Sequence, residues 1–169
     1  MHPIAQKFID NLQLEAHPEG GYFRRTYQNN ILLPDAILPH NFEGNRLAAS
    51  AIYFLLTSNS FSAFHRLQAD ELWHFYAGSV VTLYLIHPDG RLETLQLGNF
   101  LTHKTASFQV LIPAQTWFAA AVNTPDSYAL VGCTLSPAFD FSDFELANKT
   151  GLLKEYPQHF EMIERLCKE

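Results

Sequence analysis

Two side chains capable of acid–base chemistry lie close together near the middle of the chain. His65 and Glu71 stand on either side of a short polar stretch, so a hairpin there places them on neighbouring strands. Alternation of side chains along each strand brings both toward a shared interior. A carboxylate beside an imidazole favours the charged ring and makes the pair suited to proton transfer. We predict that His65 is a general base oriented by Glu71; the alternative is a buried pair that only stabilises the fold.

A second imidazole, that of His74, follows on the same predicted strand as Glu71. His65, Glu71 and His74 together have the residue types of a facial triad that holds non-haem iron. Simple alternation, however, directs His74 to the strand face opposite Glu71. We therefore expect no metal and no other cofactor, and we keep a divalent metal on these three residues as the alternative.

Polar and aromatic side chains elsewhere are candidates for ligand contacts. Tyr22 and Arg24 share one face of an extended segment, and a phenol with a guanidinium can hold an anionic or hydroxylated ligand. Tryptophan and phenylalanine rings offer a surface on which a sugar ring can stack. Glu19, beside two glycines, is expected only to shape a turn. The predicted ligand contacts are Tyr22, Arg24, Trp73, His74, Trp117 and Phe118.

The elements that position these residues are mainly strands. The 169 residues include 14 Phe and 7 Tyr, which suit the half-buried surface of a sheet. Pro88 and Gly90 mark a tight turn between two of the strands. The short spacing of the runs is typical of a sandwich or barrel. The predicted strands are 48–57, 62–67, 71–77, 80–87, 91–97, 107–112, 117–122 and 128–135.

Helices are expected at both ends of a single domain that spans residues 1–169. Apolar residues at helical spacing predict an N-terminal helical cap over about 3–13. The barrel should then occupy about 20–137. Ser142 and Glu145 have the spacing of a capping box, and Pro157 suits the first turn of a last helix. A helical tail over about 142–168 follows from these signals.

Charge and composition exclude several classes of partner. The net charge is −6 and no Lys/Arg cluster is present, so we expect no nucleic-acid and no membrane partner. The longest apolar runs are far shorter than the roughly 20 residues that cross a bilayer. The two cysteines imply no disulfide framework, and the first residues lack a secretory signal. These features favour a cytoplasmic location.

The segment around His65 resembles the first motif of the cupin superfamily. His65, Glu71 and Gly78 match that motif, and Pro113 matches the second one. Leu67 and Phe118 stand at positions where the superfamily has histidines. The resemblance therefore implies a metal set of which half the ligands are missing.

Longer matches resemble one branch of this superfamily, also known as domain of unknown function 985. They cover residues 17–24, 65–67, 70–78, 129–134 and 139–146; the departures are Arg25, where an acidic residue is expected, and Gln115. The resemblance implies an all-β-dominated, antiparallel jelly-roll (cupin) β-barrel with a short N-terminal helix and C-terminal helices. It also implies a homodimer, a small-molecule pocket and relatives among sugar epimerases and isomerases.

Three functions remain open at this point. The first is an epimerase or isomerase that uses the His65/Glu71 pair on a small, sugar-like or nucleotide-linked ligand without a full metal set. The second is a metal-dependent oxygenase or isomerase that uses His65, Glu71 and His74. The third is a barrel that binds a small molecule without catalysis, because a fold alone does not determine a reaction.

Overall fold

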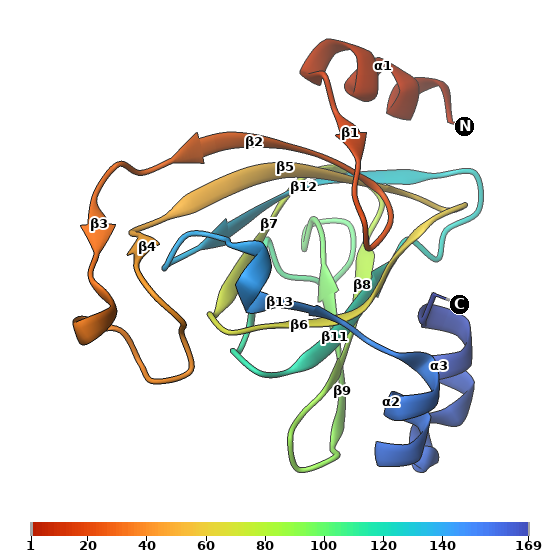
Figure 1. Cartoon of the computed structure of the whole chain (residues 1–169). Coiled ribbons are helices and arrows are strands. Elements are labelled where there is room, and N and C mark those ends of the chain that lie inside the picture. Colours follow the sequence, from red (N-terminus) through yellow and green to blue (C-terminus); the bar gives the residue numbers. More distant parts are fainter. Residues whose placement is uncertain (1, 169) are drawn as a thin grey trace.

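The computed structural model describes residues 2–168, which form two antiparallel sheets packed face to face (Figure 1). The larger sheet has the order β1 (Glu15–Ala16), β2 (Tyr22–Gln28), β5 (Ser50–Thr57), β12 (Tyr128–Leu135), β7 (Glu71–Gly78) and β10 (Gln109–Ile112). The smaller sheet has the order β13 (Phe144–Leu146), β6 (Phe61–Leu67), β11 (Trp117–Ala121), β8 (Val81–Ile86) and β9 (Leu92–Leu97). A small ribbon pairs β3 (Leu32–Leu33) with β4 (Arg46–Leu47).

The antiparallel jelly-roll topology expected from the sequence is confirmed, as a two-sheet sandwich. Most neighbouring strands in each sheet come from distant parts of the chain, as β5 and β12 do. Within residues 2–168, strand pairing does not join the two sheets into one closed barrel. The eight predicted strands all form, with ends that differ by a few residues at most.

Side chains from both sheets meet in the space between them. Phe54 of β5 and Trp73 of β7 pack there against Leu83 of β8 and Phe118 of β11. All four are at most 1% exposed. Burial of each such side chain stabilises the fold by roughly 1.5–3 kcal/mol. The polar side chains that lie in this interior are therefore the ones that require a special explanation.

The tight turn predicted at Pro88–Gly90 joins β8 to β9. Gly90 has φ = 81°, a backbone conformation that favours glycine. The Asp89 carboxylate accepts a hydrogen bond from the Arg91 amide, which closes the turn. This hairpin is confirmed in the register Ile86 opposite Leu92.

The N-terminal helix, α1 (Pro3–Leu12), forms close to its predicted ends. Its Ala5 packs against Leu55 and Leu130, which lie on the outer face of the larger sheet. Figure 1 shows the helix above that sheet. The helix therefore covers the back of β5 and β12 rather than the interior between the sheets.

The C-terminal region differs from its prediction. Phe144–Leu146 form strand β13, which pairs with β6, so the capping box predicted for Ser142 and Glu145 does not start a helix. Asp140 instead accepts the Ser142 amide in the short 3₁₀ turn Phe141–Asp143. Helical structure starts later, in α2 (Lys149–Glu155) and α3 (Phe160–Leu166). Edge pairing with β6 outweighs the local capping signal.

None of the helices within residues 2–168 is long and apolar enough to cross a membrane.

Candidate functional site

A narrow cavity lies between the two sheets and is open to solvent at one rim. Its volume is about 40 Å³. One water molecule needs roughly 10–15 Å³ of such a cavity. The cavity as it stands therefore takes only a small ligand. Its lining consists of His17, Glu19, Phe23, Arg25, Ser50, Ile52, Phe54, His65, Leu67, Glu71, Trp73, Cys133, Leu135, Phe139 and Phe144.

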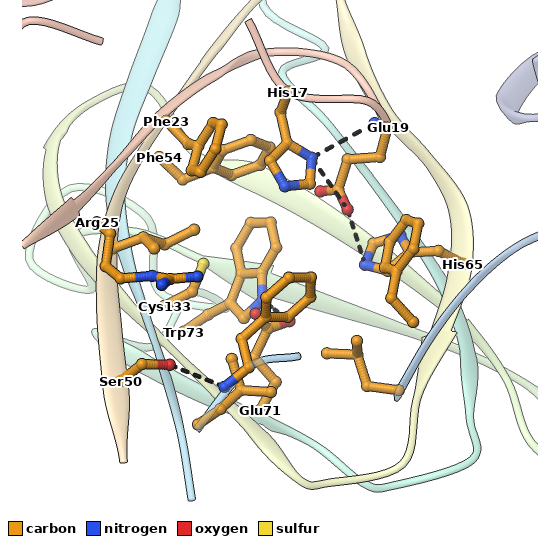
Figure 2. Close-up of a pocket in the computed structure, with 15 residues that line it drawn as sticks. His17, Glu19, Phe23, Arg25, Ser50, Phe54, His65, Glu71, Trp73 and Cys133 are labelled. Carbon is orange, nitrogen blue, oxygen red and sulfur yellow. Dashed lines mark hydrogen bonds and ion pairs between the residues drawn. The ribbon is translucent and has the colours of Figure 1, made fainter. Parts of the chain in front are cut away.

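His65 lies on β6 and is 2% exposed, and both ring nitrogens have defined neighbours. Nδ1 is 2.7 Å from the carbonyl oxygen of Ala63. Because a carbonyl only accepts hydrogen bonds, Nδ1 must carry a proton. Nε2 is 3.2 Å from Oε2 of Glu19 (Figure 2). The direct partner of His65 is thus Glu19, and the predicted orientation of His65 by Glu71 is wrong in this respect.

Glu19 comes from the turn between β1 and β2 and is buried, at 5% exposure. Its Oε1 accepts a hydrogen bond of 2.8 Å from the Ser62 hydroxyl. Its carbonyl oxygen accepts one of 2.9 Å from the Ala63 amide. Gly20 follows with φ = 117°, which lets the chain reverse there. Glu19 was expected only to shape this turn, but the turn also places its carboxyl in the cavity.

The His17 ring lies on the other side of the Glu19 carboxyl. Its Nδ1 accepts a 3.4 Å hydrogen bond from the Glu19 amide and lies 3.6 Å from Oε2 of Glu19. The edge of the ring packs against Phe23, with ring centres 4.6 Å apart. Since Nδ1 accepts, the neutral ring carries its proton on Nε2, and the ring faces the cavity (Figure 2).

Glu71 reaches the same cavity from β7, at 6% exposure. Its Oε2 accepts a 2.7 Å hydrogen bond from the indole N–H of Trp73. Burial raises the pKa of Glu71 to about 7, although the nearby His65 ring opposes this shift. Burial also raises the pKa of the adjacent Cys133 thiol well above its usual range. Glu71 is therefore poised to gain or lose a proton near neutral pH, beside a thiol that stays protonated.

The Glu19–His65 contact brings a carboxyl oxygen and a ring nitrogen to ion-pair distance. Burial lowers the pKa of His65 and raises that of Glu19. Both shifts favour the neutral pair, in which the Glu19 carboxyl donates to Nε2 of His65. Transfer of the carboxyl proton from Glu19 to Nε2 of His65 gives the ionic pair. This contact can therefore give up or take up a proton inside a site largely shielded from water.

The structure places His74 away from this group. Its ring lies on the outer face of the larger sheet, with Nε2 3.1 Å from the Thr134 hydroxyl and Nδ1 2.9 Å from the Gln109 amide nitrogen. This is the face opposite Glu71, as alternation indicates. The alternative triad of His65, Glu71 and His74 is thus not assembled.

Tyr22 and Arg24 also lie outside the cavity. They share a face of β2, as predicted, but it is the outer one: Tyr22 packs in the cluster under α1. Arg24 donates a 3.0 Å hydrogen bond to the carbonyl oxygen of Leu12. The inner face of β2 carries Phe23 and Arg25 instead. The residues of this strand that face the cavity are thus each one position after the predicted ones.

Of the three predicted aromatic contacts, only Trp73 lines the cavity. Trp117 packs in a second core under the C-terminal helices, with the Arg66 guanidinium 4.4 Å above its ring. Phe118 is buried in the main core, and its ring centre is 4.0 Å from that of His65. Phe118 supports the His65 ring from behind rather than facing a ligand.

The donor set does not fit the metal that the cupin fold implies. Of the four positions that match the cupin ligands, His65 and Glu71 carry donor atoms, whereas Leu67 and Phe118 carry none. Nε2 of His65 is engaged by Glu19. Across residues 2–168, no three His, Cys, Asp or Glu side chains are grouped so that they could hold a metal ion.

Sequence reasoning missed His17, Glu19 and Arg25 as cavity residues. Alternation placed Tyr22 and Arg24 on one face of the strand, but it did not show which face is inward. The missed signal was the aromatic Phe23, which belongs in the interior with Phe54. For Glu19, the two glycines indicated a reversal of the chain without its direction.

Comparisons with known proteins agree with this architecture. Residues 6–147 match the family model described as Cupin superfamily (DUF985). The chain is 28% identical over 148 residues to Uncharacterized protein YML079W of Saccharomyces cerevisiae, covering 82% of this chain and 72% of that protein. The crystal structure of protein SO0799 from Shewanella oneidensis is 43% identical, with a TM-score of 0.85 and coverage of 97% of each chain.

Two further solved structures are similar. A hypothetical protein from Leishmania major is 30% identical, with a TM-score of 0.87 and coverage of 98% of this chain and 99% of that one. A mutant of oxalate decarboxylase from Bacillus subtilis is 12% identical, with a TM-score of 0.53, covering 90% of this chain and 37% of that one. The last likeness concerns the fold alone. The chain belongs to the cupin superfamily, in the family described as DUF985.

Proposed function

We propose that this cupin is an acid–base enzyme of the epimerase or isomerase type, which moves a proton at a carbon atom next to a carbonyl group of a small polar substrate. One observation carries the proposal. The Glu19–His65 ion pair and the Glu71 carboxyl line the same cavity, so two titratable groups face one ligand.

The two groups have complementary roles. Ionised Glu71 accepts the proton from the substrate carbon, while the Glu19–His65 pair donates its shared proton to the carbonyl oxygen. The enol that results is neutral, which suits a cavity of low polarity. Glu71 then returns a proton to the neighbouring carbon, which bore the carbonyl group. The Glu19–His65 pair takes a proton from the hydroxyl group of the carbon first deprotonated, so that the carbonyl group moves along the substrate and the pair is restored. The substrate thus gains and loses equal numbers of protons.

The pKa of Glu71 supports its assignment as the base. Proton transfer is efficient when the pKa of the catalytic group lies near the working pH, and burial raises that of Glu71 to about 7. His65 was predicted as the base, but its Nε2 is already occupied by Glu19. We therefore assign the Glu19–His65 pair to the oxygen of the substrate.

The size of the cavity favours a small hydroxy-carbonyl compound over a nucleotide-linked sugar. The cavity volume of about 40 Å³ corresponds to a few water molecules. A nucleotide would have to lie entirely outside the rim. The aromatic surface available for stacking is Trp73, whose indole N–H is already bound to Glu71.

The test is exchange of substrate hydrogen with solvent. Small aldoses, ketoses and 2-oxo acids are incubated with the protein in deuterated water, and carbon-bound deuterium is followed by NMR. We expect incorporation with the natural protein and a loss of about 100-fold or more in His65→Gln. His74→Gln is the matched control, since His74 lies on the outer face, and it should retain the rate.

Two results would overturn the proposal. Equal exchange in His65→Gln and the natural protein would place the chemistry elsewhere. Tight binding of a panel compound by the natural protein without any exchange would identify a binding protein rather than an enzyme. Circular dichroism of each variant shows that the fold is retained.

A further inference from the structure

Arg25 is the one lysine or arginine among the described residues that line the cavity. It lies on the inner face of β2, opposite Ile52 of β5, and its side chain is exposed at the rim. Its Nη1 donates a 3.3 Å hydrogen bond to the side-chain oxygen of Gln28. Within residues 2–168, no carboxylate lies at ion-pair distance from its guanidinium. The remaining N–H groups are thus free to bind a ligand.

The Ser50 hydroxyl lies on the same side of the cavity and is 1% exposed. It is two residues from Ile52 on β5, so it is a diagonal neighbour of Arg25 across the strand pair. Its oxygen accepts a 2.9 Å hydrogen bond from the Phe139 amide. That bond uses a lone pair and leaves the hydroxyl hydrogen to donate. Across the described residues, no hydrogen bond uses the Ser50 hydroxyl as donor.

These two donors face the acid–base groups across the cavity. Figure 2 shows Arg25 and Ser50 on one side, with Glu19 and His65 on the other. An anionic group bound between Arg25 and Ser50 would leave the adjoining carbon atoms of the ligand to point inward, toward Glu71. The positive charge also offsets the repulsion that an anion would meet from ionised Glu71.

We infer that Arg25 and Ser50 form a carboxylate-binding subsite at the rim, so that the ligand is a small 2-oxo carboxylic acid. This inference rests on the proposed function for the placement of the reacting carbon. The planar guanidinium matches a carboxylate with two parallel hydrogen bonds. A phosphate dianion would leave one charge without a permanently charged partner, since the described lining of the cavity offers no second lysine or arginine.

Affinity measurements test the subsite separately from catalysis. Pyruvate, lactate and glycolate are titrated into the protein by calorimetry, with lactamide as the neutral analogue and inorganic phosphate as the other anion. We expect the carboxylates to bind and the other two to bind roughly 10- to 100-fold more weakly. Arg25→Gln should weaken carboxylate binding by a similar factor, and Ser50→Ala by less.

Arg24→Gln is the matched control, because Arg24 is adjacent in sequence but lies on the outer face. Equal carboxylate affinity in Arg25→Gln and the natural protein would overturn the inference, and so would tighter binding of phosphate or of lactamide. Carboxylate binding that depends on Arg25, without deuterium exchange in any of these acids, would uphold the subsite and reject the proposed reaction. The two claims therefore fail in different experiments.

Discussion

The carboxyl oxygen Oε2 of Glu19 lies 3.2 Å from Nε2 of His65, although the two residues come from a turn and from a strand of the opposite sheet. Such a buried contact is stable only if both atoms share a proton or carry opposite charges. The other nitrogen of His65 is fixed by the Ala63 carbonyl. The ring can therefore change its protonation only at the atom that meets Glu19.

Replacement of Glu71 by glutamine should change how stability depends on pH. The folded pKa of about 7 exceeds the value of 4.5 for an unperturbed glutamate. Below about pH 4.5 Glu71 is protonated in both the folded and the unfolded state, so it does not lower the free energy of unfolding. Between the two values only the unfolded state ionises, so stability falls as pH rises, by about 3 kcal/mol in total. Glu71→Gln lacks this loss.

Urea unfolding at several pH values measures the difference. The free energy of unfolding of Glu71→Gln minus that of the natural protein should rise between pH 5 and 8 and then level off. Burial lowers the pKa of His65 and the Glu71 charge raises it, so the same comparison is made in a His65→Gln background, which removes the coupled titration of that ring. A difference that stays constant over this range would mean that the pKa of Glu71 is not raised.

Replacement of Gly20 by alanine should disturb both the fold and the site. A Cβ atom at Gly20 would collide with the carbonyl oxygen of Phe61, and the φ of 117° is itself unfavourable for alanine. We expect a destabilisation of about 3 kcal/mol or more. Gly44 also has a positive φ, but a Cβ there makes only an ordinary contact of 3.9 Å with Nη1 of Arg46. Gly44→Ala should therefore cost only about 1–2 kcal/mol. Equal costs in thermal or urea unfolding would show that the turn before β2 can relax.

A buried ion pair fixes β4 and the short turn before β13. Arg46 donates to both carboxylate oxygens of Asp143, each at 2.7 Å, and both side chains are less than a tenth exposed. Asp143→Asn leaves the guanidinium without its counter-charge and should destabilise the protein by about 3–5 kcal/mol. The exposed pair of Arg66 and Glu145 provides the comparison, and Glu145→Gln should cost less than about 1 kcal/mol. Similar costs for the two variants would contradict the structural role of the buried pair.

The strands of this fold follow from the sequence because each buried run alternates or is continuously apolar between clear turn signals. The Pro88–Gly90 hairpin is determined by its own turn residues. The C-terminal region is different, since Phe144–Leu146 becomes a strand only through pairing with β6. A local capping signal cannot show that a distant edge is available.

The candidate site was also predictable only in part. His65 and Glu71 were placed in one interior by alternation alone, and both line the cavity. The partner of His65 was not predictable, because Glu19 reaches it through a turn whose direction depends on two glycines with positive φ. Arg25 was missed because one-residue slips in a strand exchange its two faces.

Deuterium exchange with Glu19→Gln tests the central claim most directly. The amide keeps the shape of the side chain and can still bond to His65, but it cannot pass a proton to Nε2. The account predicts that this variant folds and loses exchange by about 100-fold or more on a substrate that the natural protein labels. Exchange at the natural rate in folded Glu19→Gln would contradict the claim that the Glu19–His65 contact is the proton-transferring pair.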